Sequence, residues 1–193
     1  MRDGFIKIAA VSPEMRVADC AYNAEKITEA ISRAAAEGVR LLVLPELCLT
    51  GYTCGDLFFQ QALAEGAEAA LARILRDTEK LSVAALVGLP AAHEGKLYNC
   101  AAVICEGRLL GVVPKKNLPN YGEFYEKRWF RPAPAENTRL RLCGENVPFG
   151  TKLLFQCAAM KDFRFAAEIC EDLWVPEPPS VRHTLAGALI IAN

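Results

Sequence analysis

Short apolar runs alternate along the first eighty residues with longer segments that repeat apolar residues at helical spacing. Residues 5–11 form a run of strand length, and residues 19–37 follow the helical pattern until Gly38, a residue type that often stands just past a helix C-terminus. Residues 41–44 form a second apolar run, and residues 56–80 are rich in Ala and Leu and contain no Pro. The pattern predicts strand, helix, strand and helix in that order.

A hairpin and a long irregular segment follow. After a predicted strand at residues 81–89, apolar segments at 97–105 and 108–113 meet at Glu106-Gly107, which is typical of a two-residue β-turn. Residues 115–150 are too rich in Pro, Gly, Asn and Arg to form one long element. A loop of this length within a domain indicates a function.

Two last strands are predicted at residues 163–169 and 185–192. Strands that alternate with helices, together with one hairpin, predict a layered α/β fold with a mixed sheet. The last apolar run stands at the very end of the sequence with no helix after it, so we expect a truncated domain that spans residues 1–193.

Composition narrows the partners of the protein. Its 193 residues fit one domain, and 52% hydrophobic residues are enough for a core. The 22 basic and 23 acidic residues leave a net charge of −1, which favours neither nucleic acid nor an anionic membrane as a partner. No apolar run approaches the roughly eighteen residues of a membrane span, and we expect a cytoplasmic protein with eight free cysteines.

Three chemically complementary side chains stand at the ends of predicted strands: Glu46, Lys115 and Cys170. Ligands of open α/β sheets bind beyond the carboxyl ends of the strands. A thiolate is a strong nucleophile, a carboxylate can take the proton of a thiol, and an ammonium group can stabilise an oxyanion. The backbone N–H of Glu171 would be a second oxyanion donor. The set predicts an acyl-transfer site.

The surroundings of these residues favour a joint role, although each one alone also fits a plain structural role. Glu46 stands before the apolar residues 47–49, where an unpaired charge would be costly to bury. Carboxylates at positions 168, 171 and 172 flank Cys170 and would raise the pKa of its thiol, so a cation such as Lys115 would be useful there.

A histidine or metal mechanism is less favoured. His93 falls in an expected surface turn, and His183 follows a Pro-rich bend, so we interpret both as solvated; a Cys–His dyad with His183 stays an alternative. No C-x-x-C pair occurs, and neither histidine has a partner at ligand spacing, so we expect no catalytic metal.

Around Glu46, Lys115 and Cys170 the sequence resembles the nitrilase, or carbon–nitrogen hydrolase, superfamily, whose members use a Glu–Lys–Cys triad. The resemblance covers nearly the whole chain, and its spacing selects Lys115 over Lys116. The three motifs are residues 44–52 (LPELCLTGY), 115–119 (KKNLP) and 169–172 (ICED). A narrower resemblance, to the glutamine-hydrolysing domains of glutamine-dependent NAD synthetases, lies in residues 50–58 and 118–130.

The resemblance implies further site residues. Tyr121 would help to bind L-glutamine, and Glu123 or Glu126 would supply a supporting carboxylate near the triad. Glu171 and Trp174 would line the pocket. Each of these also fits a plainer role in packing or in a solvated face.

The resemblance also implies a fold and partners: a four-layer α-β-β-α sandwich, incomplete at its C-terminus, in a homo-oligomer. ATP and Mg would act in a separate synthetase domain of the same polypeptide, and no cofactor is expected in this chain. Two alternatives stay open, a stand-alone amidase for another small amide and a non-catalytic fragment.

Overall fold

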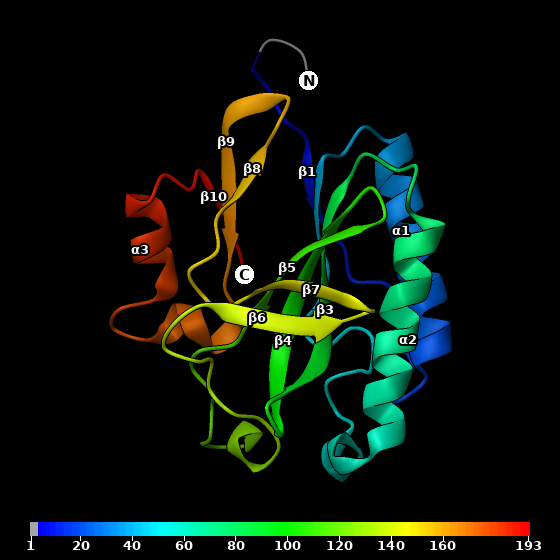
Figure 1. The fold of residues 1–193 in the computed structure, drawn as a ribbon, viewed down its shortest axis with the longest axis vertical. Helices are drawn as coiled ribbons and strands as arrows, with labels where there is room; N and C mark the ends of the chain where they lie inside the picture. Colours follow the sequence, from blue (N-terminus) through cyan, green and yellow to red (C-terminus); the bar gives the residue numbers. More distant parts are fainter. Residues whose placement is uncertain (1–3) are drawn as a thin grey trace.

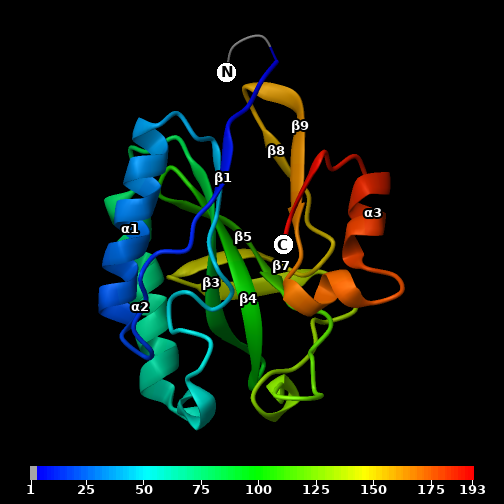
Figure 2. The same cartoon turned by 180° about the vertical axis from the view of Figure 1, so that it is seen from behind.

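The computed structural model describes residues 4–193 and arranges them in four layers. Two long helices, α1 (Cys20–Ala36) and α2 (Gln61–Asp77), cover one face of a seven-stranded sheet, and a three-stranded sheet packs against the other face (Figure 1). A short helix, α3 (Pro179–Leu185), lies outside the smaller sheet, and Figure 2 shows the same layers from behind. The expected α-β-β-α sandwich is confirmed.

The larger sheet is mixed, as the sequence predicts. In spatial order its strands are β1 (Ile8–Ala10), β2 (Leu41–Val43), β3 (Ala84–His93), β4 (Lys96–Cys105), β5 (Arg108–Pro114), β7 (Glu145–Phe149) and β6 (Thr138–Leu142). β1, β2 and β3 are parallel, whereas β4 is antiparallel to both β3 and β5. β2, β3 and β5 therefore run in the same direction and end toward the same edge of the sheet.

The smaller sheet consists of β8 (Phe155–Cys157), β9 (Met160–Ala167) and β10 (Ile190–Ala192). β9 lies in the middle, parallel to β10 and antiparallel to β8. The described residues also include short 3-10 helices: η1 (Gly55–Phe59), η2 (Glu126–Arg128) and η3 (Cys170–Trp174).

The larger sheet is apolar on both faces. Leu42 and Val112 pack into the core beneath α1 and α2, whereas their neighbours Leu41 and Val113 pack against the smaller sheet. Because successive side chains of a strand point to opposite faces, a sheet covered on both sides needs continuous apolar strands. This explains the uninterrupted apolar runs of the sequence.

Local signals determine where α1 begins and ends. The side chain of Asp19 accepts a hydrogen bond from the backbone N–H of Tyr22 at 3.0 Å and caps the first turn. After the last turn, Gly38 adopts a φ of +77°, and the N–H groups of Gly38 and Val39 donate to the carbonyls of Ala35 and Ala34. The predicted stop at Gly38 is confirmed.

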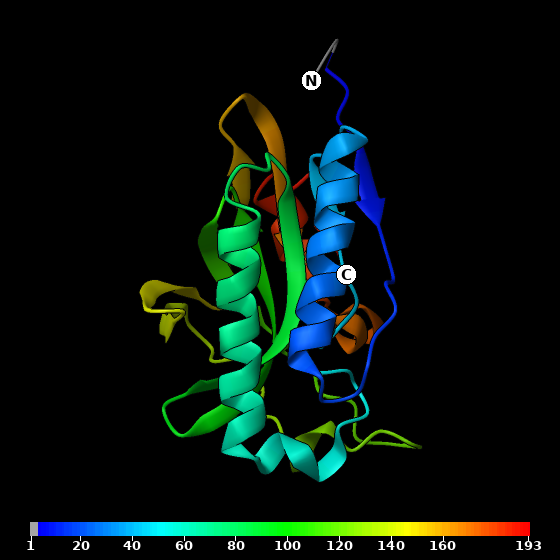
Figure 3. The same ribbon diagram turned by 90° about the vertical axis from the view of Figure 1, so that its right-hand side faces the viewer.

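The two long helices lie side by side over the sheet (Figure 3). The helices approach each other near Gly66 of α2, where an added Cβ atom would lie 3.6 Å from the Sγ atom of Cys20, at ordinary van der Waals distance. The predicted helical region at residues 56–80 is divided into η1 and α2 at Gln60, whose backbone is extended.

The expectation of an irregular segment at residues 115–150 was wrong in its second half. β6 and β7 form a hairpin there, joined at Cys143-Gly144 with φ values of 53° and 79°. The confirmed hairpin at Glu106-Gly107 has φ values of 50° and 73°. A third pair, Glu94-Gly95, joins β3 to β4. Positive φ at both central residues matches the twist of a hairpin, and glycine adopts it readily.

The predicted strand at residues 185–192 was also too long. Leu185 ends α3, and Gly187 turns the chain with a φ of +95° before the short strand β10. Pro179 is the first residue of α3, a position that proline favours because its missing N–H would be unpaired there anyway. The predicted strand at 163–169 is confirmed as β9, displaced toward the N-terminus.

Candidate active site

Glu46 lies in the turn that follows β2. Within this turn Leu47 has a φ of 52°, a left-handed conformation that costs a residue with a side chain about 1–2 kcal/mol. The turn packs on β3 at Gly88, where an added Cβ atom would lie 2.6 Å from the carbonyl oxygen of Pro45. Because glycine has no Cβ, the backbone that carries Glu46 can approach the sheet this closely.

Lys115 directly follows β5, and its side chain is fully buried. Its Nζ atom lies 2.7 Å from Oε1 of Glu46 and 2.7 Å from Oε1 of Glu126, a residue of η2. Burial disfavours the charge of a lysine, but the two carboxylates outweigh this effect, and the pKa of Lys115 is raised. Lys115 is therefore an ammonium ion at neutral pH.

One ammonium ion faces two carboxylates, and two neutral groups donate further hydrogen bonds to them. The hydroxyl of Tyr52 donates to Oε1 of Glu126 at 2.8 Å, and the side-chain amide of Asn99 donates to Oε1 of Glu46 at 2.5 Å. Glu126 is only 1% exposed, and burial raises its pKa even though the contact with Lys115 lowers it. The cluster balances a buried excess of negative charge with donors from several elements.

Cys170 is the first residue of η3 and has a φ of 47°. Its backbone N–H donates to Oδ1 of Asn193 at 3.1 Å. The buried carboxylate of Asp172 accepts from the N–H of Ile169 at 3.1 Å and from the N–H of Asn117 at 2.7 Å. Asp172 therefore ties the turn that carries the thiol to the segment that follows the lysine.

The thiol of Cys170 is neutral at neutral pH. Burial is the largest cause of its raised pKa, the negative charge of Glu46 adds to it, and the positive charge of Lys115 offsets it in part. A neutral thiol must lose its proton before it can attack a carbonyl carbon. Glu46 is the carboxylate placed to accept that proton, because its side chain and that of Cys170 point toward each other.

We expected the carboxylates that flank Cys170 in sequence to raise its pKa. This expectation was wrong, because other carboxylates raise it. Glu168 accepts a hydrogen bond from the backbone at the start of α3, Glu171 accepts one from a tyrosine hydroxyl, and Asp172 accepts several from the backbone. The carboxylates that raise the pKa most are Glu46 and the buried glutamate of η2. Neighbours in sequence point in different directions in a tight turn.

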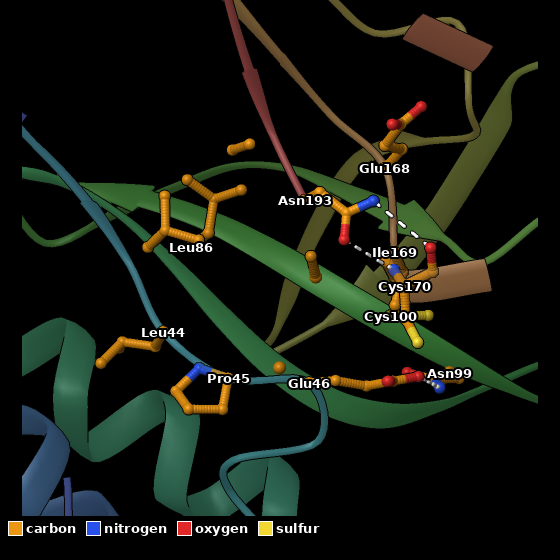
Figure 4. Close-up of a pocket in the computed structure, with 14 residues that line it drawn as sticks. Leu44, Pro45, Glu46, Leu86, Asn99, Cys100, Glu168, Ile169, Cys170 and Asn193 are labelled. Atoms are coloured by element: carbon orange, nitrogen blue, oxygen red, sulfur yellow. Dashed lines mark hydrogen bonds between the residues drawn. The ribbon is translucent and has the colours of Figure 1, made fainter. Parts of the chain in front are cut away.

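A cavity of about 180 Å³ opens between the two sheets at the ends of their strands. Glu46, Asn99, Cys170 and Asn193 contribute polar groups to its wall, and Leu44 and Leu86 are among its apolar residues. Figure 4 shows the side chains of Cys170 and Glu46 pointing toward each other in this cavity. All three residues of the predicted triad follow strands, but of the three only Glu46 and Cys170 line this cavity.

The other predicted site residues lie off the wall of this cavity. Tyr121 donates to Glu171 at 2.9 Å, and this hydrogen bond is the main cause of the raised pKa of Tyr121. Trp174 is 75% exposed, and Glu123 is exposed too. Of the two glutamates considered as a supporting carboxylate, Glu126 contacts the buried lysine.

Sequence reasoning missed two residues of the charged cluster. Asn99 interrupts an apolar strand, and Tyr52 was noticed only as part of a motif. A buried polar side chain must find a hydrogen-bond partner, so a lone asparagine within a buried strand was the available signal.

The interpretation of His183 as solvated was wrong. It is buried in α3, and its Nε2 atom lies 2.7 Å from the carbonyl oxygen of Thr151, so it donates there. His93, expected in a surface turn, is the last residue of β3 and packs against Tyr98 and Phe149.

All eight cysteines have free thiols, as expected. Within residues 4–193, no three His, Cys, Asp or Glu side chains are grouped so as to hold a metal ion. None of the helices in this range has the length and apolar character needed to cross a membrane.

Comparison with known proteins agrees with this geometry. Residues 7–193 match the carbon-nitrogen hydrolase family model. A glutamine-dependent NAD(+) synthetase from Mycobacterium bovis is 40% identical over 190 residues, which are 98% of this chain and 28% of that protein. A crystal structure of a glutamine-dependent NAD(+) synthetase from Cytophaga hutchinsonii has a TM-score of 0.83 and 33% identity, and the match covers 96% of this chain and 30% of that one.

A mutant amidase from Nesterenkonia sp. AN1, with the acetamide moiety of fluoroacetamide covalently added at its active site cysteine, has a TM-score of 0.70 and 25% identity. That match covers 98% of this chain and 64% of the amidase. The chain thus spans less than a third of the length of the synthetases and about two thirds of the amidase. The family model matches nearly all of its residues, and the chain belongs to the carbon–nitrogen hydrolase family.

Proposed function

We propose that this chain hydrolyses the side-chain amide of L-glutamine to glutamate and ammonia, with Cys170 as the nucleophile. The observation that carries the proposal is the fully buried ammonium group of Lys115, which bridges Glu46 and Glu126 while the thiol faces Glu46. Burying a cation with two carboxylates is costly for folding, and a cavity lined by a thiol whose pKa is raised is a candidate reaction site.

In the first step the sulfur of Cys170 attacks the amide carbon, and the thiol proton passes to Glu46. The C=O electron pair moves to the oxygen, which becomes an oxyanion. The ammonium group of Lys115 stabilises this charge, aided by the backbone N–H of Glu171 in the first turn of η3. That N–H has no hydrogen-bond acceptor among residues 4–193.

In the second step the tetrahedral intermediate collapses. Glu46 returns the proton to the amide nitrogen, the C–N bond breaks, and ammonia leaves a thioester on Cys170. Water then attacks the thioester carbon while Glu46 takes its proton, the C–S bond breaks, and Glu46 returns the proton to the sulfur as glutamate leaves. Glu46 thus acts as base and then as acid in each half of the reaction.

The choice of glutamine rests on the resemblance to synthetases described as glutamine-dependent. The pair Tyr121 and Glu171 supports it, because Glu171 directly follows the nucleophile and its carboxylate suits the α-ammonium group of an amino acid. Trp174, the last residue of η3, would offer an apolar wall. A simple aliphatic amide would need none of these groups.

We also propose that the ammonia serves a separate synthetase domain, which amidates deamido-NAD with ATP and Mg, and that the subunits form a homo-oligomer. This follows from the relatives, which are NAD(+) synthetases much longer than this chain. The residues described here do not fit a metal site, since no three ligand side chains meet among them. No step above therefore passes through ATP or Mg.

A substrate panel tests the proposal. We expect ammonia release from L-glutamine to exceed release from asparagine, acetamide and propionamide by at least about tenfold, which corresponds to roughly 1.4 kcal/mol of selective binding. The variants Cys170→Ala and Glu46→Gln should abolish it. Equal rates on aliphatic amides would instead support a general amidase, which the likeness to the Nesterenkonia enzyme favours. No release from any amide would contradict hydrolysis and favour a non-catalytic fragment.

A further inference from the structure

Asn99 is a buried polar residue in the middle of β4, and the mechanism above does not use it. It is 1% exposed and lies between the apolar neighbours Tyr98 and Cys100. Its Nδ2 atom donates to Oε1 of Glu46 at 2.5 Å. Its Oδ1 atom is buried and has no hydrogen-bond partner among the described residues. An apolar side chain, which needs no hydrogen-bond partner, would suit this strand better.

The orientation of the Asn99 amide follows from its neighbour. An amide has a donating end and an accepting end, and a carboxylate can only accept. If the amide were turned over, two oxygen atoms would face each other, so its nitrogen must lie against Glu46. The unpaired oxygen is the consequence, and leaving it unpaired costs stability. The asparagine gains a contact with the carboxylate at the expense of the fold.

Asn99 also lies between the two charged residues of the site. Its side chain holds Glu46, and its backbone carbonyl accepts a hydrogen bond from the N–H of Lys115 at 2.8 Å. Oε1 of Glu46 receives both the Asn99 amide and the Lys115 ammonium group. Neither of these contacts uses the second carboxylate oxygen, and the side chain of Cys170 points toward Glu46 in Figure 4.

We propose that Asn99 is a positioning residue for the base: its amide holds one oxygen of Glu46 and leaves the other oxygen to the thiol of Cys170. This inference rests on the proposed role of Glu46 as the base. Two titratable groups, Lys115 and Cys170, face that carboxylate directly. Two more, Glu126 and Tyr52, lie beyond the lysine, and the four come from separate segments of the chain. All four stay in place when only Asn99 changes.

The test is the pH profile of alkylation of Cys170 by iodoacetamide, followed by peptide mass spectrometry in the chain and in two variants of similar shape. Asn99→Leu removes the donor, and Asn99→Asp replaces it by an acceptor. A donor favours the ionised carboxylate, so the acid side of the profile should move to higher pH by about one unit in the Leu variant and further in the Asp variant. The rates should converge again at alkaline pH.

The same pair of changes at Asn146, an exposed residue of β7, should leave the profile unchanged. The Leu variant should also melt within a few degrees of the unchanged chain, because it loses an unpaired oxygen along with the donor. If it does not fold, the Asp variant carries the test alone. An unmoved acid side, or a loss that is equal at every pH, would overturn the proposal.

Iodoacetamide is not a glutamine analogue, so the profile remains informative whatever the natural amide is. A chain that shows the shift but releases no ammonia from glutamine would retain Asn99 as the positioning residue and refute glutamine hydrolysis. A chain that hydrolyses glutamine without any shift would refute the role of Asn99 alone.

Discussion

At the scale of single residues, the site is governed by one ammonium group shared between two carboxylates. Lys115 contacts Glu46 on one side and Glu126 on the other, at 2.7 Å each. Glu46 lines the cavity, whereas Glu126 is buried away from it. The two glutamates therefore have different parts: Glu46 can exchange protons with a ligand, whereas Glu126 acts on the lysine by contact and on the thiol by its charge.

Glu126→Gln tests this division of roles. The carboxylates raise the pKa of Lys115, so removal of one charge lowers that pKa, and the ammonium form should be lost at a lower pH. We expect the alkaline side of the ammonia-release profile to move to lower pH, and the rate at pH 8 to fall about 10- to 100-fold, as for loss of a charged hydrogen bond.

Glu123→Gln is the matched control, because it makes the same change at an exposed position of the same segment. Its profile should coincide with that of the unchanged chain. If the two variants behaved alike, Glu126 would have no specific effect on the lysine.

How much of the site is predictable at this scale depends on where each residue lies. Glu46, Lys115 and Cys170 follow apolar strands, so their types and positions could be inferred from the sequence. Asn99 lies within a strand, and only its partner shows why it is polar. The directions of side chains around Cys170 depend on a residue with a φ of 47°, which the sequence alone does not indicate.

At the scale of elements, close contacts between backbones position the groups of the candidate site. The turn after β2 rests on Gly88, and Asp172 joins η3 to the segment after β5. Neither contact involves the reacting atoms, yet each determines how far apart the carboxylate, the ammonium group and the thiol lie.

Gly88→Ala should disrupt the first of these contacts. The new Cβ atom would overlap the backbone of Pro45 and Leu47, which cannot move aside as a flexible side chain can. We expect the free energy of unfolding to fall by about 1–3 kcal/mol in denaturant titrations, and ammonia release to fall further because Glu46 is displaced.

Gly66→Ala is the control, since its Cβ atom would meet only ordinary contacts within α2. Alanine favours a helix over glycine, so this variant should be more stable by about 0.5–1 kcal/mol. A Gly88→Ala chain as stable as the unchanged one would show that the turn does not depend on this approach.

Element prediction succeeded where a local signal was strong. Glu106-Gly107 stands between two apolar runs and was recognised as a hairpin turn. Cys143-Gly144 has the same geometry but follows a strand in which Arg and Leu alternate, inside a segment rich in turn residues. The C-terminal strand was overextended because apolar residues flank Gly187 on both sides, and its turn is visible only in the structure.

At the scale of the whole molecule, the site exists only where the two sheets meet. Glu46 and Lys115 follow strands of the larger sheet, whereas Cys170 follows β9 of the smaller one. The core between the sheets, from Leu41 and Val113 to Phe165, therefore holds the thiol opposite Glu46. The sequence predicted a layered α/β fold, but the family resemblance was needed to predict two stacked sheets, since apolar runs do not show which sheet each strand joins.

The most direct test of the central claim is covalent labelling of the folded chain with a diazo-ketone analogue of glutamine, followed by peptide mass spectrometry. The account predicts a single adduct at Cys170, slowed by L-glutamine and lost in Glu46→Gln, while the other seven thiols stay unmodified. A well-folded chain that remains unlabelled at Cys170, or that is labelled equally at its other cysteines, would contradict an assembled nucleophile site.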